Sequence, residues 1–123
     1  EQVELVDSLP RDLLLARLRS SMALLSASTE EGFDYPVLEA KAEGIPTLIS
    51  DIPVHREFHQ GSSLFFPAHD DGSVLASQLQ ALIRDRSLWT HLSCSGLDLA
   101  RSLTVDAQIA QISVQINNLS KSC

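Results

Sequence analysis

Residues 22–50 have the sequence MALLSASTEEGFDYPVLEAKAEGIPTLIS, and this stretch decides the fold. Met22–Ser26 and Ile45–Ser50 are short apolar runs of the kind found in strands that are covered on both faces. Between them, Pro36–Glu43 is predicted to be a helix, because proline suits the first helical position and Gly44 suits the position just past the end. The stretch therefore predicts two strands of one parallel sheet joined by a helix.

The rest of the chain continues this alternation of strands and helices. The further predicted elements are strands Val3–Val6 and Ser63–Phe66, a helical turn His55–His59, and helices Arg11–Ser20, Ser73–Asp85, Leu88–Leu103 and Thr104–Leu119. The last helix has the most regular apolar stripe, which comprises Val105, Ile109, Ile112, Ile116 and Leu119. Thr104 fits its N-cap. The predicted fold class is α/β with a parallel, doubly wound sheet.

Composition and charge narrow the classes of function. The chain has 123 residues, 44% of them hydrophobic and 20% charged, which indicates one soluble globular domain. A net charge of −7 argues against nucleic-acid binding, which needs a surplus of Lys and Arg. The sequence contains no apolar run long enough to span a membrane, and no signal peptide is expected. Cys94 and Cys123 lie far apart, so neither a disulfide framework nor a metal site is expected, and a reducing cytosol is the simplest compartment.

The loop Thr29–Tyr35 is the candidate binding site. It follows a buried strand and precedes a helix, where free backbone amides and the positive end of the helix dipole favour an anionic oxygen. Glu31 and Glu39 lie eight positions apart around this helix start. Two exposed glutamates are ordinary by composition alone, but open α/β sheets bind ligands at the carboxyl ends of their strands. We therefore expect this loop to hold a phosphate.

The segment from Glu31 to Glu39 is a glutamate, seven intervening residues and a second glutamate. It resembles the signature of the GT-B fold retaining glycosyltransferases, described as glycosyltransferase family 4 or "glycosyl transferases group 1". The resemblance continues in order through Ala40–Pro46, Ser50–Pro53, Arg56-Glu57, Leu64–Pro67, Asp70-Asp71 and Leu99–Arg101. It covers most of the chain and implies a Rossmann-like parallel sheet flanked by helices, as the incomplete C-terminal half of a GT-B enzyme.

The resemblance implies a role for each residue of the signature. Glu31 would contact the donor sugar as the catalytic residue, and Glu39 would accept hydrogen bonds from the ribose hydroxyls. The backbone between them would hold sugar hydroxyls and the diphosphate; its residues are Gly32, Phe33, Asp34, Tyr35, Pro36, Val37 and Leu38. Carboxylates accept hydroxyl hydrogen bonds well, and a helix start favours a phosphate. Many members have glycine where this chain has Asp34, so donor choice is expected to depend on that side chain.

The function that the resemblance implies is part of a retaining glycosyltransferase. Such an enzyme, a hexosyltransferase, moves a sugar from a nucleotide-sugar donor to a glycan or lipid-linked acceptor, here in bacterial surface polysaccharide synthesis. The donor is a substrate, and no cofactor or metal is implied, because the sequence has no Asp-x-Asp motif. The expected location is cytoplasmic, with the parent enzyme at the inner face of the membrane, and no nucleic-acid partner or transmembrane segment is expected.

Residues 1–123 match only part of such a C-terminal nucleotide-sugar-binding domain. The first two βα units, which supply the Arg and Lys that neutralise the donor diphosphate, are missing, as is the whole N-terminal acceptor domain. The chain also lacks an initiator Met, so we expect a fragment that is inactive alone. Without the missing strands, Val3–Val6 would lie apart from Met22–Ser26. We therefore expect the first strand to have moved, or a second chain to fill the gap by self-association through exposed sheet edges.

Two other classes of function remain open. One is a non-catalytic α/β binding or assembly module, and the other is a different GT-B enzyme, such as a sugar-nucleotide epimerase or a phosphorylase. The sequence has no dinucleotide, P-loop or nucleophile-elbow motif. His55 and His59 are four positions apart, but Glu57 is out of register with the zinc motif His-Glu-x-x-His. We expect these two histidines to be solvated residues of a turn.

Overall fold

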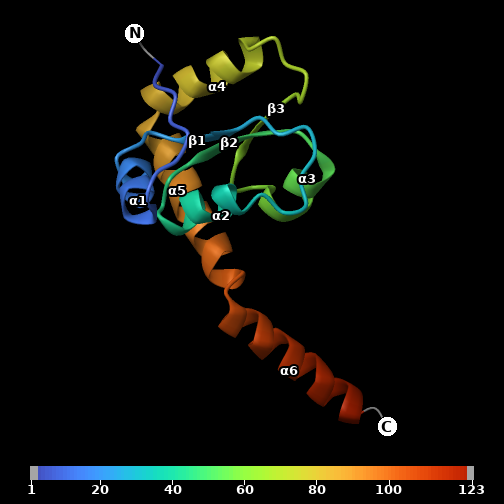
Figure 1. Ribbon diagram of the computed structural model, residues 1–123. Helices are drawn as coiled ribbons and strands as arrows, with labels where there is room; N and C mark the ends of the chain where they lie inside the picture. The colour runs from blue at the N-terminus through green and yellow to red at the C-terminus, as the bar shows by residue number, and fades with distance from the viewer. Residues whose placement is uncertain (1–2, 122–123) are drawn as a thin grey trace.

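The structure, a computed structural model, describes residues 3–121, with side chains described as far as Asn118. In chain order the elements are α1 (Arg11–Arg19), β1 (Leu24–Ser26), α2 (Tyr35–Ala42), β2 (Thr47–Ser50), α3 (Pro53–His59), β3 (Leu64–Phe66), α4 (Ser73–Arg84), α5 (Arg86–Ser102) and α6 (Val105–Lys121). The three strands form one parallel sheet in the order β1-β2-β3 (Figure 1). This confirms the predicted α/β class, with a Rossmann-like parallel sheet flanked by helices. Cys123 lies outside the described residues.

The strand β2 lies at the centre of the sheet and of the core. All four of its residues are buried, because β1 and β3 flank it and helices cover it. Leu48 of β2 packs with Phe66 of β3, Leu82 of α4 and Leu92 of α5 in one hydrophobic cluster. Each such side chain stabilises the fold by roughly 1.5–3 kcal/mol when it is fully buried. The predicted buried strand is confirmed here, although its regular part begins at Thr47 instead of Ile45.

The strand β1 differs from the prediction in its surroundings. Met22–Ser26 was expected to be covered on both faces, but the strand is shorter, and Leu25 at its middle is 53% exposed. Within residues 3–121, β1 pairs only with β2, so its other edge and part of one face have no covering element. The apolar run correctly predicts a strand, but an apolar sequence alone does not tell how many faces are covered.

The segment Val3–Val6 is irregular, so the prediction of a strand there was wrong. Leu5 in this segment is 92% exposed, and Glu4 accepts two hydrogen bonds of 3.0 Å from the Arg17 guanidinium of α1. A short apolar segment forms a stable strand only when a neighbouring strand edge provides hydrogen-bond partners. Among the described residues Val3–Val6 pairs with no strand, and the predicted strand has not been moved to another place in the sheet.

The helix α6 forms as predicted but leaves the body of the molecule (Figure 1). The Thr104 hydroxyl accepts a hydrogen bond of 3.3 Å from the Ala107 amide, which confirms the predicted N-cap. The described part of its apolar stripe is uncovered: Ile109, Ile112 and Ile116 are each between 55% and 60% exposed. The side chain of Leu119, the last residue of the predicted stripe, lies outside the described residues. In the part of the chain that the structure describes, no helix is long and apolar enough to cross a membrane.

Candidate functional site

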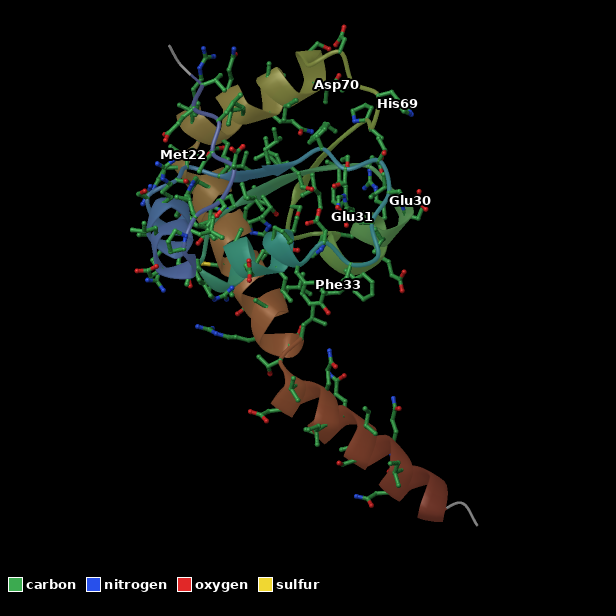
Figure 2. All side chains as sticks on the ribbon, viewed as in Figure 1. Met22, Glu30, Glu31, Phe33, His69 and Asp70 are labelled. Atoms are coloured by element: carbon green, nitrogen blue, oxygen red, sulfur yellow. The ribbon has the colours of Figure 1, made fainter. Side chains whose placement is uncertain are left out.

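A cleft of about 410 Å³ opens beside the loop that joins β1 to α2. One wall is the loop itself and the other is the start of α3, where the lining residues are Thr29, Glu30, Glu31, Gly32, Ile52, Pro53, Val54, Glu57 and Phe58. Both walls follow the carboxyl ends of neighbouring parallel strands, β1 and β2, which is where open α/β sheets bind ligands. Figure 2 shows Glu30, Glu31 and Phe33 on the side of the molecule where α3 lies.

Glu31 is exposed at this cleft and is held by its own loop. The hydroxyl of Ser28 donates a hydrogen bond of 2.6 Å to Glu31 Oε1, which leaves the second carboxylate oxygen available. Glu30 and Glu57 bring two further carboxylates to the same lining, and no Lys or Arg is among the described residues that form it. An acceptor-rich, negatively charged cleft suits a polyhydroxyl ligand such as a sugar better than it suits a free anion.

The loop before α2 adds free backbone donors, and one of its residues, Gly32, lines the cleft. No hydrogen bond within the described residues uses the backbone amides of Gly32, Phe33, Asp34 or Tyr35. The helix begins at Tyr35, so Pro36 is its second residue and not its first as predicted. Tyr35 is the first helical residue and Asp34 its N-cap, while Gly32 and Phe33 belong to the loop before it. Free amides that lead into a helix N-terminus, near the positive end of the dipole, favour phosphate oxygens.

Glu39 lies apart from Glu31, on the exposed side of α2. Its Oε1 accepts a hydrogen bond of 3.0 Å from Arg11 of α1, and both side chains reach solvent. The structure therefore brings Glu31 into the cleft but gives Glu39 an internal cationic partner. The roles assigned to the signature residues from Glu31 to Glu39 stay predictions.

The side chain of Asp34 points into the protein and not toward the cleft. It is buried, its Oδ2 accepts a hydrogen bond of 2.5 Å from the Ser26 hydroxyl, and it lies 3.0 Å from His55 Nε2. Its backbone has φ 61° and ψ 68°, in the left-handed region. In this geometry the Asp34 side chain would therefore not contact a nucleotide-sugar donor in the cleft directly.

His55 and His59 are both fully buried, so the prediction of solvated turn residues was wrong. They lie on one face of α3, with their ring centroids 6.1 Å apart, and Phe33 covers His59 at 6.3 Å. Burial, and then the positive charges of Lys41 and His55, lower the pKa of His59 to about 4. The i, i+4 spacing beside the apolar Phe58 is the sequence signal that could have indicated an inward-facing stripe.

Lys41 is a buried residue that the sequence did not reveal. The buried residues of α2 are Val37, Ala40 and Lys41, although a lysine is usually exposed. The Lys41 ammonium donates a hydrogen bond of 2.5 Å to the Ser62 hydroxyl, and burial lowers the pKa of Lys41 to about 7. Gly96 of α5 makes room for it, since a Cβ there would lie 3.1 Å from Lys41 Cγ.

Comparison with known proteins relates part of this chain to glycosyltransferases. Two proteins of Escherichia coli, each named serotype-specific mannosyltransferase WbdA, are 43% identical to it over 56 residues. A third of the same name is 38% identical over 55 residues. Each match spans 45% of this chain and 7% of the relative, so the chain corresponds to a small part of those proteins. No protein-family model matches the chain.

Proposed function

We propose that this chain is part of the donor-binding half of a retaining GT-B glycosyltransferase. The whole protein would transfer a sugar from a nucleotide-sugar donor to a glycan or lipid-linked acceptor in bacterial surface polysaccharide synthesis, in the cytoplasm. The observation that carries this proposal is an acceptor-rich cleft beside a loop, Gly32 to Tyr35, whose backbone amides are unbonded within the described residues and whose Gly32 lines the cleft. A nucleotide sugar has hydroxyls and a diphosphate, which are the complementary groups.

The proposed roles follow from what each group can accept or donate. The Glu31 carboxylate would accept hydrogen bonds from sugar hydroxyls beside the reacting carbon. The backbone of Gly32 to Leu38 would hold the diphosphate, and Glu39 would bind the ribose after exchanging its contact with Arg11. As the bond between sugar and diphosphate breaks, negative charge grows on the leaving phosphate, and fixed amides stabilise that charge without rearranging.

The cations that neutralise the diphosphate are not part of the proposed site within this chain. Arg56, the nearest guanidinium to the cleft wall in sequence, donates two hydrogen bonds to Asp51 and lies over the Phe65 ring. Among residues 3–121 no group of three or more potential metal ligands comes together. We therefore propose that these residues bind the donor weakly and do not complete the transfer alone.

Donor binding tests the proposal directly. GDP-mannose and UDP-glucose are titrated by calorimetry into the wild type and into Glu31→Ala and Glu39→Ala. Glu4→Ala and Glu43→Ala are matched controls, since each removes a glutamate that pairs with an arginine outside the cleft lining. Charged hydrogen bonds are worth roughly 1.5–3 kcal/mol, so each test variant is expected to weaken binding about tenfold or more, and each control less than threefold. Absence of wild-type binding, or equal losses in test and control variants, would overturn the proposal.

A non-catalytic assembly module is the second candidate, and one observation favours it. The open edge of β1 borders an apolar cavity of about 230 Å³ whose lining is Met22, Ala23, Leu24, Leu25, Leu48, Leu75 and Leu79. An uncovered strand edge with apolar side chains is a template for association with another chain. Self-association with no affinity for either nucleotide sugar would support this candidate over the donor-binding one. A sugar-nucleotide epimerase would be recognised instead by an altered sugar on the recovered labelled donor.

A further inference from the structure

Asp34 adopts a backbone conformation that its residue type does not favour. Among residues 3–121 it is the one non-glycine residue with a positive φ, while Gly44, Gly61 and Gly72 adopt the same region. Left-handed geometry is unfavourable for an ordinary L-residue, and aspartate tolerates it better than most. Asp34 directly precedes α2, so its φ and ψ set the direction of the amides of Gly32 to Tyr35 relative to the helix.

The Asp34 carboxylate is used inside the protein to hold this conformation. It makes no hydrogen bond to the first turn of α2, although aspartate often caps a helix in that way. Instead Oδ2 accepts from Ser26 Oγ of β1 at 2.5 Å and lies 3.0 Å from His55 Nε2 of α3. One buried oxygen thus joins the strand before the loop to the helix that forms the opposite wall of the cleft.

His55 uses both of its ring nitrogens in polar contacts, and one of these contacts is to Asp34. His55 Nδ1 lies 2.7 Å from the Ser50 carbonyl oxygen, which can only accept, so Nδ1 carries a hydrogen. The other ring nitrogen, Nε2, lies 3.0 Å from Asp34 Oδ2. Both side chains are buried, and removing either one leaves the other without that partner.

We infer that the buried chain from Ser26 through Asp34 to His55 is a positioning device for the donor loop. Resting on the proposed function, it directs the amides of Gly32 to Tyr35 at the diphosphate of the nucleotide sugar. Asp34 and His55 are positioning residues in this scheme, because they act on the ligand through the backbone. Hydrogen bonds hold Asp34 in the left-handed backbone conformation, which a glycine adopts without a steric penalty.

Four variants separate this role from general stability. Asp34→Gly keeps the left-handed conformation available but leaves His55 Nε2 without its partner, so it is expected to weaken GDP-mannose binding about threefold to fivefold, less than Asp34→Ala does. Asp34→Ala has neither the freedom nor the hydrogen bonds, so binding is expected to weaken about tenfold or more. His55→Leu leaves Asp34 buried without its partner and is expected to weaken binding similarly. The double variant Asp34→Gly with His55→Leu has no orphaned carboxylate and is expected to regain most of the affinity.

His59→Leu is the matched control for His55→Leu. His59 is buried on the same face of α3, and neither of its ring nitrogens has a hydrogen-bond partner in the described part of the chain. This variant is expected to bind GDP-mannose like the wild type. Backbone amide NMR shifts of Gly32, Phe33 and Tyr35 in the free proteins provide the second readout. They should move in Asp34→Ala and His55→Leu. In His59→Leu the Gly32 and Tyr35 shifts should stay near wild-type values, and Phe33 is left out of that comparison because its ring packs against His59.

The outcomes keep the two proposals apart. Wild-type binding that Asp34→Ala and His55→Leu leave unchanged would overturn the positioning role and leave the proposed function standing. The positioning role is equally overturned if the double variant folds but does not recover affinity. If the wild type binds neither GDP-mannose nor UDP-glucose, the proposed function fails, and the ligand assigned to the positioned loop fails with it.

Discussion

The strands β1 and β2 are neighbours in one sheet, yet they meet very different surroundings. Leu25 and Leu48 are register partners in the two strands, and one is 53% exposed while the other is 1% exposed. Around β2 even polar groups are enclosed, as with Lys41, His55 and His59. Around β1 and along α6, apolar side chains remain uncovered. Similar apolar sequences therefore form a fully buried strand in β2 and a partly exposed strand in β1. The burial of a strand depends on which other elements are present to cover it.

Truncating the two register partners should give the largest contrast. Leu48→Ala is expected to lower the free energy of unfolding by about 2–5 kcal/mol, because it leaves a cavity among Phe66, Leu82 and Leu92. Leu25→Ala should lower it by less than about 1 kcal/mol, since much of that side chain is already in water. Urea unfolding of both variants measures the difference. Equal losses of unfolding free energy in the two variants would show that Leu25 is covered in solution.

The enclosed ammonium of Lys41 should make stability depend on pH. Its folded-state pKa of about 7 lies below the ordinary lysine value of 10.5, so between those values the unfolded chain binds more protons, and raising the pH stabilises the fold. From pH 7 to 9 the wild type should gain up to about 1.4 kcal/mol per pH unit relative to Lys41→Met, which cannot titrate there. Urea unfolding at several pH values checks this, because other groups titrate equally in both proteins. If the unfolding free energies of the wild type and Lys41→Met change with pH in parallel, Lys41 is not a buried amine with a lowered pKa.

The open edge of β1 should promote weak self-association. Sedimentation equilibrium of the wild type is expected to give an average mass that rises with protein concentration. Leu25→Lys places a charge at the middle of the edge strand and should remove that rise without a large loss of stability. A wild type that stays monomeric at every concentration would mean that the uncovered edge is tolerated.

The smallest effect is expected on the stripe of α6. Ile112 is 55% exposed, so Ile112→Lys should change the free energy of unfolding by less than about 0.5 kcal/mol. Leu92→Ala on the buried side of α5 is the comparison variant and should cost several times more. A large loss on Ile112→Lys would show that α6 packs against something in solution.

The sequence predicted the elements well where local patterns determine them. Apolar runs located β1, β2 and β3, and Thr104 and Gly44 marked a helix start and a helix end as predicted. It did not predict strand pairing or side-chain burial, which depend on residues far away in the sequence. Val3–Val6 has strand composition but no paired edge among the described residues, and the stripe of α6 has helical spacing but no cover there.

For the candidate site, the sequence predicted the place of the loop but not the partners of its buried side chains. Its place at the carboxyl end of β1 followed from the order of strand, loop and helix, and the spacing of Glu31 and Glu39 marked the loop. The partners were not predictable, because Asp34, His55 and Lys41 take theirs from other elements: Ser26, Ser50 and Ser62. Charged and polar side chains are usually solvated, so no local pattern marked these three side chains as buried.

The most direct test of the donor-binding claim is an amide NMR titration of the wild type with GDP-mannose. The predicted result is saturable shifts at Gly32, Phe33 and Tyr35 and at the Glu31 amide, with smaller changes at the facing start of α3, and no such set in Glu31→Ala at the same concentrations. Shifts confined to other surfaces, such as the β1 edge or α6, would contradict donor binding at this loop. So would the absence of any shift at millimolar GDP-mannose.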